Sequence, residues 1–318
     1  MGDKSNIQWT DATWNPVTGC TKVSPGCAHC YAETTADRFW AAQYPHVDQQ
    51  TRQPVNATSL PSTTEPRQFN DVWTHTDRLD QPLRWKRPRR IFVNSMSDLF
   101  HEAVSDEFVD RVFAVMALCP QHVFQVLTKR AERMRDYLGA NPGEQAGVRD
   151  RVLVAMQRVA GVSVAVTWPL WNVWLGVSVE NQHFADERIP LLLQTLAAVR
   201  FISAEPLLGP INLRELAHRE DWYVDALDTP DLMRRLDWVI IGGDSGPNAR
   251  PCELDWIRFL RDQCRAAGVP AFVKQLGSHS QHYQSRLFLR DRKGGDPSEW
   301  SLDLRVREWP NILKERDV

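Results

Sequence analysis

The sequence of 318 residues predicts an α/β protein built on a full or partial parallel (β/α) barrel with loop insertions. Short apolar runs of strand length recur along the chain, and a segment with helical spacing follows most of them. Each run ends in polar or glycine-rich residues. A doubly wound open sheet is the alternative fold that this periodicity leaves open.

Seven segments are expected to form strands. The first is a short strand near Thr13–Thr18, and the other six are Ile91–Val93, Val123–Leu127, Val173–Val177, Val199–Ile202, Trp238–Ile241 and Ala271–Val273. Near-continuous apolar character is typical of parallel strands that are covered on both faces. Trp174 and Trp238 lie inside two of these runs, so we expect both in the core.

Helical patterns separate the strands. Ser105 is a favoured N-cap for a helix that carries apolar residues at helical spacing from Phe108 to Met116. Further helices are expected over Ala131–Leu138, Pro190–Ala198 and Leu254–Ala267, the last of which ends at Gly268.

Three polar segments do not fit the repeat and are expected to be loop insertions: residues 43–82, 140–150 and 218–235. From residue 278 the chain is polar and charged. The sequence therefore predicts one barrel domain over residues 1–277 and a C-terminal appendage over residues 278–318, with Trp300 and Trp309 docking this tail.

Composition bears on the partners of the protein. No apolar run reaches the ~18 residues of a membrane span, and the first residues lack the apolar stretch of a signal peptide, so a soluble cytoplasmic protein is expected. The net charge of −2 gives no global attraction for nucleic acid. The segment Arg84–Arg90 nevertheless gathers five cations around Trp85. It is either a solvated approach to the next strand or a phosphate-binding patch.

Three of the six cysteines, Cys20, Cys27 and Cys30, lie in one loop near the N-terminus. The other three, Cys119, Cys252 and Cys264, stand apart in apolar or helical surroundings and are expected to be buried free thiols. The clustered thiols suit a metal site. Zinc would take His29 or a distant histidine as its fourth ligand, whereas a [4Fe–4S] cluster held by three cysteines leaves one iron open.

Polar residues follow the predicted strands, where parallel barrels place their active sites. They comprise the carboxylates Asp98, Glu180, Glu205 and Asp244, the hydroxyls of Ser95, Ser178 and Ser203, and Lys129 and Lys274. Any single one of them could instead cap the next helix. Gly242 and Gly243 would allow a ligand to approach the backbone closely.

Six motifs together carry a family resemblance. They are Thr-Gly-Cys20 through Cys27-x-x-Cys30-Tyr-Ala, Asn94-Ser-Met-Ser-Asp98, Thr128-Lys129-Arg130, Gly176-Val-Ser178-Val-Glu180-Asn181, Ser203-Ala-Glu205-Pro206 and Gly242-Gly243-Asp244-Ser-Gly246. The set resembles radical S-adenosylmethionine (SAM) enzymes and is more closely similar to a phage-associated family of uncharacterised proteins with a three-cysteine motif. The likeness covers most of the chain. The sequence departs from the usual superfamily spacing, because six residues separate Cys20 from Cys27 and His29 takes the place of an aromatic residue.

The resemblance implies a fold, two cofactors and a set of roles. The barrel would be of the radical SAM, TIM-barrel-like type, and Cys20, Cys27 and Cys30 would bind three irons of a [4Fe–4S] cluster. SAM would bind the fourth iron and be cleaved, on reduction by an electron donor, to a 5′-deoxyadenosyl radical that modifies an unknown substrate. The expected SAM-binding residues are Ser95, Asp98, Ser178 and Glu180, with Gly242, Gly243 and Asp244 as further cofactor-binding residues. Lys129 and Lys274 would face substrate or a carboxylate, and Glu205 would transfer a proton or orient the substrate.

Two other functions remain open at this stage. One is a barrel with a zinc-stabilised loop that acts as a binding module for a partner or nucleic acid. The other is a zinc- or magnesium-dependent hydrolase of nucleic acid that uses some of the four strand-end carboxylates as ligands. The phage association and the basic segment make DNA, RNA or a nucleotide the candidate substrate of the enzyme.

Overall fold

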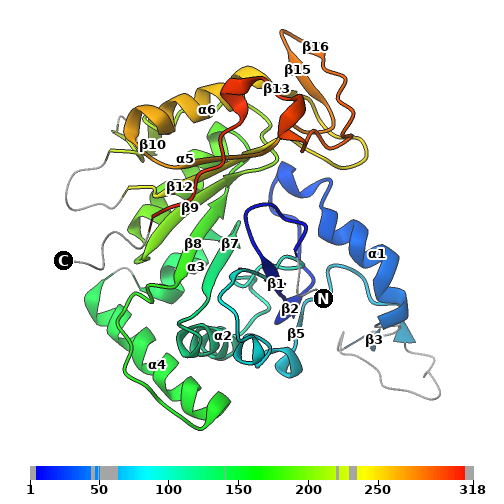
Figure 1. Cartoon of the computed structure of the whole chain (residues 1–318). Helices are drawn as coiled ribbons and strands as arrows, with labels where there is room; N and C mark the ends of the chain where they lie inside the picture. Colours follow the sequence, from blue (N-terminus) through cyan, green and yellow to red (C-terminus); the bar gives the residue numbers. More distant parts are fainter. Residues whose placement is uncertain are drawn as a thin grey trace.

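The computed structural model describes residues 5–43, 47–48, 50, 64–139, 141–219, 222–228 and 235–311. Seven strands form one parallel sheet that curls into a half-barrel flanked by helices (Figure 1). The strands are β1 (Ala12–Trp14), β6 (Arg90–Val93), β7 (Val123–Thr128), β8 (Val173–Ser178), β9 (Val199–Ala204), β12 (Trp238–Gly242) and β14 (Ala271–Gln275).

The order of strands in the sheet is their order in the chain, β1-β6-β7-β8-β9-β12-β14. A doubly wound sheet reverses its strand order at a switch point, and this sheet has no reversal. The α/β class and a partial parallel barrel are therefore the observed architecture. Within the described residues, β1 and β14 are the two edges of the sheet.

Both faces of the sheet are covered, which explains the continuous apolar runs of the sequence. Every residue of β8 and β9 is buried. One face packs against the helices, and the concave face holds a mainly aromatic cluster that includes Trp9, Trp174 and Trp238. The indoles of Trp174 and Trp238 meet edge to face at 5.8 Å. The prediction that both residues belong to the core is confirmed.

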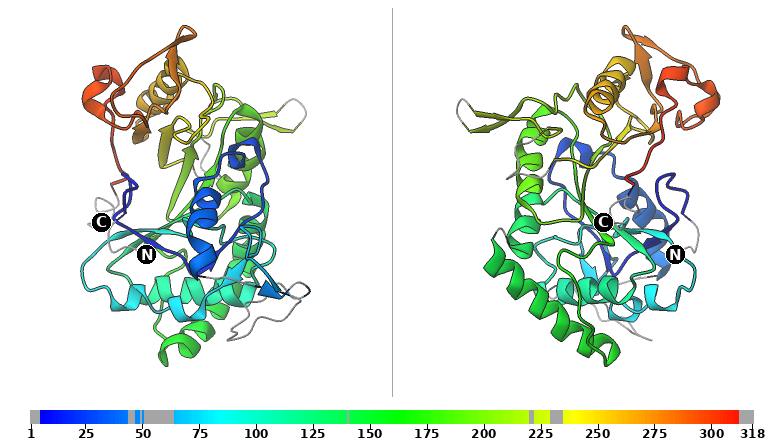
Figure 2. Two further views of the ribbon diagram at one scale, coloured as in Figure 1. Left: turned by 90° about the vertical axis from the view of Figure 1, so that its right-hand side faces the viewer. Right: turned by 60° about the vertical axis from the view of Figure 1, so that its left-hand side comes forward.

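The helices connect successive strands and lie on the outer face (Figure 2). They are α2 (Asp106–Leu118), α3 (Ala131–Leu138), α4 (Pro142–Ala160), α5 (Gln182–Gln194) and α6 (Leu254–Ala267). Helix α5 packs on β8 and β9, α6 packs on β12 and β14, and α2 packs on α4. Ser105 caps α2 as expected, because its hydroxyl accepts the N–H of Phe108 at 3.3 Å.

Two sequence expectations about helices are wrong. The predicted helix Pro190–Ala198 is α5, which begins eight residues earlier because Asn181 caps it, and Pro190 lies within this helix. Residues 140–150 were expected to form a loop, but α4 starts at Pro142, with Asn141 accepting the N–H of Glu144 at 3.0 Å. Proline fits the first helical turn, where its missing N–H removes no internal hydrogen bond.

The remaining elements decorate the half-barrel. Helix α1 (Tyr31–Gln43) follows the three cysteines directly. The short strands are β2 (Val17–Thr18) with β5 (Trp73–Thr74), β3 (Val47–Asp48) with β4 (Thr64–Glu65), and β10 (Leu216–Arg219) with β11 (Trp222–Val224). Single turns of 3₁₀ helix cover Pro25–Cys27, Thr76–Arg78 and Pro82–Arg84. Residues 44–46, 49 and 51–63 of the first expected insertion, and residues 220–221 and 229–234 of the third, lie outside the described residues.

The C-terminal segment packs along the edge of β14. The N–H of Glu308 donates to the carbonyl of Ala271 at 2.9 Å, and the N–H of Val273 donates to Val306 at 2.8 Å. Trp300 is buried, and the ring of Trp309 lies 4.9 Å from that of Phe272. The other elements of this region are β13 (Cys252–Glu253), β15 (Ser280–His282), β16 (Ser285–Arg286) and two 3₁₀ turns at Pro297–Glu299 and Leu302–Leu304.

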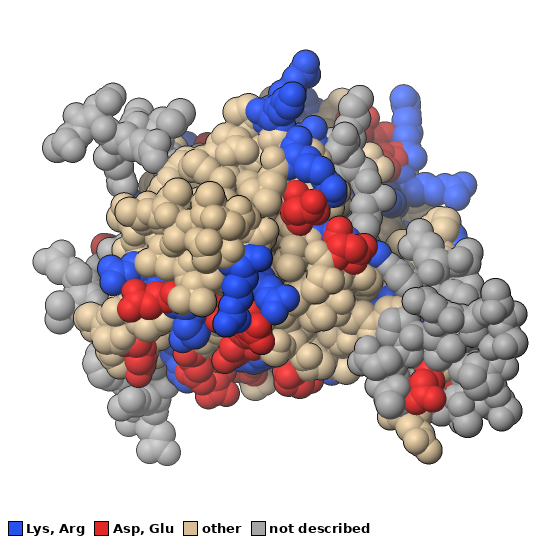
Figure 3. Space-filling view, turned by 90° about the horizontal axis from the view of Figure 1, so that it is seen from below, with Lys and Arg blue, Asp and Glu red and all other residues tan. Residues whose placement is uncertain are grey.

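Charge is mixed on the side of the molecule where α2 and α4 lie. Figure 3 shows this side with cationic and acidic side chains next to one another. Arg111 and Arg158 both pair with Glu107, and Arg151 pairs with Asp110. The two exposed pairs of Glu107 stabilise the fold only slightly, whereas Asp110 is buried. None of the helices described is both long and apolar enough to cross a membrane.

Candidate functional site

The cysteine loop, residues 20–30, lies against the C-terminal edge of the parallel sheet. Backbone contacts fix its start, because the N–H of Cys20 donates to the carbonyl of Phe69 at 2.9 Å. Gly19 precedes it with φ +93°, and a Cβ there would lie 2.3 Å from the carbonyl oxygen of Asp71. Only glycine fits this position. Phe69 and Asp71 of the first insertion thus support the start of the loop.

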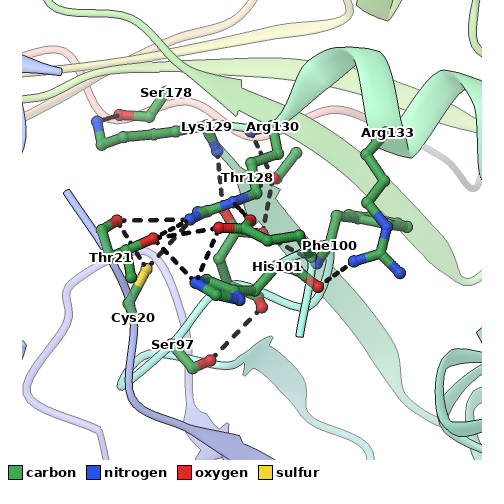
Figure 4. A network of polar contacts seen from close by, with 12 residues as sticks. Cys20, Thr21, Ser97, Phe100, His101, Thr128, Lys129, Arg130, Arg133 and Ser178 are labelled. Atoms are coloured by element: carbon green, nitrogen blue, oxygen red, sulfur yellow. Dashed lines mark hydrogen bonds and ion pairs between the residues drawn. The ribbon is translucent and has the colours of Figure 1, made fainter. Parts of the chain in front are cut away.

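Arg130, directly after β7, contacts the first cysteine. Its guanidinium Nη1 lies 3.7 Å from Cys20 Sγ, and Nη2 donates to Thr21 Oγ1 at 2.8 Å (Figure 4). Two carboxylates orient the guanidinium: Asp98 Oδ2 lies 3.3 Å from Nη1, and Glu102 Oε2 accepts from Nε at 2.8 Å. The arrangement places a fixed positive charge beside the Cys20 thiol.

Asp98 is engaged by the chain itself. Asp98 is only 5% exposed, and its carboxylate accepts the Thr128 hydroxyl at 2.7 Å and the N–H groups of Phe100 and Lys129 at 3.0 and 3.1 Å. Arg130 is a fourth donor group. A carboxylate has about four acceptor sites, so Asp98 has little capacity left for a ligand in this arrangement.

Glu180, after β8, forms a second connection to the cysteine loop. Its side chain is fully buried, and Oε1 accepts the hydroxyl of Ser24 at 2.9 Å. Lys129 and Arg188 both pair with this carboxylate, Arg188 through Nη1 at 3.3 Å from Oε2. A Cβ at Gly26 would lie 2.4 Å from Glu180 Oε1. The loop therefore sits directly on this carboxylate.

Asp244, after β12, forms the third connection. Its Oδ2 lies 3.4 Å from His29 Nδ1 and 3.1 Å from Arg250 Nε. Arg250 in turn donates from Nη1 to the carbonyl of Pro25 at 2.6 Å. His29, considered from sequence as a zinc ligand, faces a carboxylate here. Three strand-end carboxylates thus hold the loop, directly or through arginines.

Lys129 and Lys274 each pair with a strand-end carboxylate. Lys129 Nζ donates to Ser178 Oγ at 2.6 Å as well as to Glu180. Lys274 Nζ pairs with Glu205 Oε1, which also accepts Gln275 Nε2 at 3.1 Å. The first cluster comes from the ends of β7 and β8, and the second from the end of β9 and from β14, while Ser178 on β8 lies opposite Ser203 on β9.

Gly242, Gly243 and Ser95 have different surroundings in the structure. A Cβ at Gly243 would lie 2.2 Å from the carbonyl oxygen of Leu276, so the chain's own backbone makes the close approach there. A Cβ at Gly242 would lie 3.5 Å from Glu205 Cδ, an ordinary contact distance. Ser95 Oγ donates to Asn15 Oδ1 at 3.1 Å, and its carbonyl accepts the Tyr31 hydroxyl.

The three thiols share one electrostatic neighbourhood. Burial raises the pKa of Cys20 to about 12, with Asp98 adding to the shift and Arg130 opposing it, and burial also raises the pKa of Cys30. Cys27 contributes to raising both pKa values. All three are free, like the buried Cys119, Cys252 and Cys264, which confirms the expectation for the latter. In the described part of the chain, no group of three or more His, Cys, Asp or Glu side chains is arranged to hold a metal ion. The donor set suits an iron–sulfur cluster chemically, but the described side chains do not form a preorganised site.

The basic segment 84–90 lies at the opposite end of the sheet, because Arg90 begins β6. Arg90 pairs with Asp11 at 3.0 Å, Arg84 pairs with Asp80 at 3.2 Å, and Arg89 lies 4.9 Å from the ring of Trp85. Lys86 and Arg87 form no ion pair with the described residues. The segment does not line the candidate site.

Sequence reasoning missed the arginines that organise the site. Arg130 is the neighbour of Lys129 in a motif already singled out, Arg188 lies on the helix after Glu180, and Arg250 lies six residues after Asp244. Ser24 and Gly26 were also missed, although they stand between the cysteines. An arginine six to eight residues after Glu180 and Asp244 was the available signal for these two carboxylates.

Comparison with known proteins gives one family. A family model described as "Protein of unknown function (DUF5131)" matches residues 4–305. The match includes the cysteine loop, all seven sheet strands and most of the C-terminal segment. No curated protein and no solved structure matches the chain significantly.

Proposed function

The chain belongs to the family described as protein of unknown function (DUF5131), and we propose that it is a radical SAM enzyme of unknown substrate. Cys20, Cys27 and Cys30 would hold a [4Fe–4S] cluster, and SAM would be its partner at the open iron. One observation carries the proposal: side chains that follow three different strands hold the cysteine loop at the C-terminal edge of a partial parallel barrel.

The position of the cysteine loop at the C-terminal edge of the sheet supports the proposed enzymatic function. Parallel barrels carry their active sites at the C-terminal edge, where residues from separate strands meet. A loop that only stabilised the fold could be packed on apolar surface. Cys20 and Cys30 do pack against an apolar cluster that includes Trp40 and Phe69, but polar side chains from the sheet also contact the loop, and Glu180 is fully buried beneath Ser24.

The lysines are the chain's clearest binding groups for such a reaction. When bound, the cluster would supply the electron that cleaves SAM, and the protein would position the reactants and exclude water. An ammonium group has three donors. Lys129 uses two, on Ser178 and Glu180, and Lys274 uses one, on Glu205. The remaining donors can bind a carboxylate of SAM or of the substrate, and Glu205 can accept a proton beside Lys274.

In this proposal, the carboxylates that are already paired with cations of the chain position other residues of the site. Asp98 orients Arg130 against Cys20, and Glu180 supports the cysteine loop while it pairs with Lys129. Asp244 orients Arg250 and faces His29. Ser95 and Ser178 remain the candidates for contact with SAM, because the Ser95 carbonyl accepts from Tyr31, which follows Cys30, and the Ser178 hydroxyl lies beside Lys129.

The same pairing weakens the case for a hydrolase that binds hard metal ions. Such an enzyme would need carboxylates that converge on a shared point. Asp98, Glu180, Glu205 and Asp244 instead face Arg130, Lys129 with Arg188, Lys274 and Arg250 respectively. Their charge is largely balanced by the chain.

Metal analysis of protein purified without oxygen tests the proposal. The parent, Cys27→Ala and Cys264→Ala would be reconstituted with iron and sulfide and analysed for iron, sulfide, zinc and absorption at about 400 nm. Cys264 is a matched control, because it is a free thiol buried in α6. We expect about four irons per chain in the parent and in Cys264→Ala, and loss of iron from Cys27→Ala.

Zinc without iron in the reconstituted parent would contradict the proposal and favour the zinc-stabilised binding module. Equal iron in Cys27→Ala and the parent would remove the cysteine loop as the site of the cluster.

A further inference from the structure

A cavity of about 670 Å³ lies beside Asp244 and Arg250, the residues that connect β12 to the cysteine loop. One wall is formed by residues 245–249, which follow Asp244, and the other by residues 277–280, 286–289 and 291–293. Its volume falls in the range of ~300–1,000 Å³ typical of small-ligand sites. The loop of residues 244–250 thus contacts the cysteine loop through Asp244 and Arg250 and lines the cavity through the residues between them.

The cavity is lined by cations that are available for a ligand. Arg286, Arg292 and Lys293 line it, and all three are exposed. Neither Arg292 nor Lys293 forms an ion pair with the described residues. The one carboxylate in the lining, Asp291, accepts the backbone N–H groups of Lys293 and Gly295 at 3.0 and 2.8 Å. Asp291 offsets one of the three positive charges, so the lining keeps a net charge of +2 (three cations less one carboxylate).

An aromatic ring stands beside these cations. Phe288 is 90% exposed, and the guanidinium of Arg286 lies 5.9 Å from its ring. Proteins that bind single-stranded nucleic acid combine cations for the phosphates with exposed aromatic rings on which bases stack. Arg292 and Lys293 supply the first element, and Phe288 supplies the second.

We propose that this cavity binds the phosphate and base of a substrate that contains a nucleotide, either a free nucleotide or a unit of a single strand. This inference rests on the proposed function, because it assigns the substrate class of the same enzyme. Arg292 and Lys293 bind the phosphate, Phe288 stacks on the base, and the loop of residues 244–250 connects the bound substrate to the cysteine loop. The basic segment 84–90 takes no part, because it lies at the other end of the sheet.

Binding to the full-length protein, without SAM or reductant, tests the inference. The probe is a fluorescein-labelled oligothymidylate followed by anisotropy over a series of salt concentrations, with thymidine 5′-monophosphate as competitor. The variants are Arg292→Gln/Lys293→Gln and Phe288→Ala, all at exposed positions where folding is not at risk. The matched control is Lys86→Gln/Arg87→Gln, which removes the same charge at the opposite end of the sheet.

We expect Arg292→Gln/Lys293→Gln to weaken binding and to reduce the slope of log K against log salt by about 1.4, since each phosphate contact on a single strand contributes about 0.7. Phe288→Ala should weaken binding about 5-fold to about 150-fold with little change in slope. The control should bind like the parent. Competition by the mononucleotide assigns the site to a free nucleotide, and failure to compete assigns it to a strand; both support the shared chemistry.

Three results would overturn the inference: no binding of either probe by the parent, equal losses in the cavity variant and the control, or full binding by Phe288→Ala together with an unchanged salt slope in the cation variant. Iron is measured in the same samples. Iron-loaded protein that fails to bind overturns this inference alone, whereas zinc-containing protein that binds through the cavity overturns the proposed function.

Discussion

Replacing Gly26 by alanine tests the contact between the cysteine loop and the sheet. A Cβ at this position would lie 2.4, 2.5 and 2.7 Å from the Oε1, Cγ and Cδ atoms of Glu180. Side-chain atoms do not pack this closely, so either the glutamate or the loop must move. Glu180 cannot move freely, because it is fully buried and pairs with Lys129 from the end of β7 and Arg188 from α5.

The loop is therefore the part that yields. Its retreat breaks the hydrogen bond from Ser24 to Glu180, and hydrogen bonds to charged groups contribute about 1.5–3 kcal/mol. Overpacking of a buried contact costs a similar amount, about 1–3 kcal/mol. The same movement of the loop relieves the clash and breaks the hydrogen bond, so the protein loses either the hydrogen bond or the overpacking energy, and the two costs are not added. We expect the free energy of unfolding to fall by about 1–3 kcal/mol and the loop to retain less iron.

Chemical denaturation and iron analysis measure the two effects. The control is Gly147→Ala within α4, where an added Cβ has no atom within 4 Å. Alanine in a helix interior should stabilise the protein by about 0.5–1 kcal/mol relative to glycine. If Gly26→Ala is as stable as the control and retains as much iron, the loop does not rest on Glu180 as described.

Two further predictions concern residues beside the loop. His75 Nε2 lies 2.8 Å from the hydroxyl of Thr18, two residues before Cys20. Burial, aided by the charge of Arg67, lowers the pKa of His75 to about 4, so the unfolded chain binds the proton more tightly. The contribution of neutral His75 to the free energy of unfolding is fully present above pH 6.5 and falls by about 3 kcal/mol as the pH drops to about 4. In denaturation measured over this pH range, His75→Gln should lose less stability than the parent. Equal pH dependence in the two proteins would refute the assignment. Arg130→Met should lose iron to a chelator faster than the parent, because no cation remains beside Cys20, whereas Arg135→Met on the outer surface should not; equal rates would show that Arg130 does not hold the loop.

The strands of the half-barrel could be predicted because burial on both faces leaves a direct mark on the sequence. Helices covered on one side also showed their apolar spacing, as in α2, α3 and α6. Two prolines lie inside helices whose starts the sequence analysis placed wrongly or missed. Pro142 opens α4 and Pro190 lies inside α5, and the asparagine caps at Asn141 and Asn181 mark the true starts of these helices.

The candidate site could be predicted only as a set of residues at one edge. Strand order brought the polar groups together, but their partners depend on contacts between distant segments. Ser24 and Glu180 are 156 residues apart, and Arg130 and Cys20 are 110 apart. Sequence alone could not show that Asp98 and Glu180, expected to bind SAM, are already engaged by the chain. It also could not show that Gly243 is approached by the backbone of Leu276.

The central claim is that the cysteine loop presents an iron–sulfur cluster with one open iron to SAM. The most direct measurement is electron paramagnetic resonance of the reduced, reconstituted parent before and after addition of SAM. The account predicts the signal of a reduced [4Fe–4S] cluster whose shape changes when SAM is added, because SAM binds the iron that no cysteine holds. A cluster signal that SAM leaves unchanged would contradict the claim.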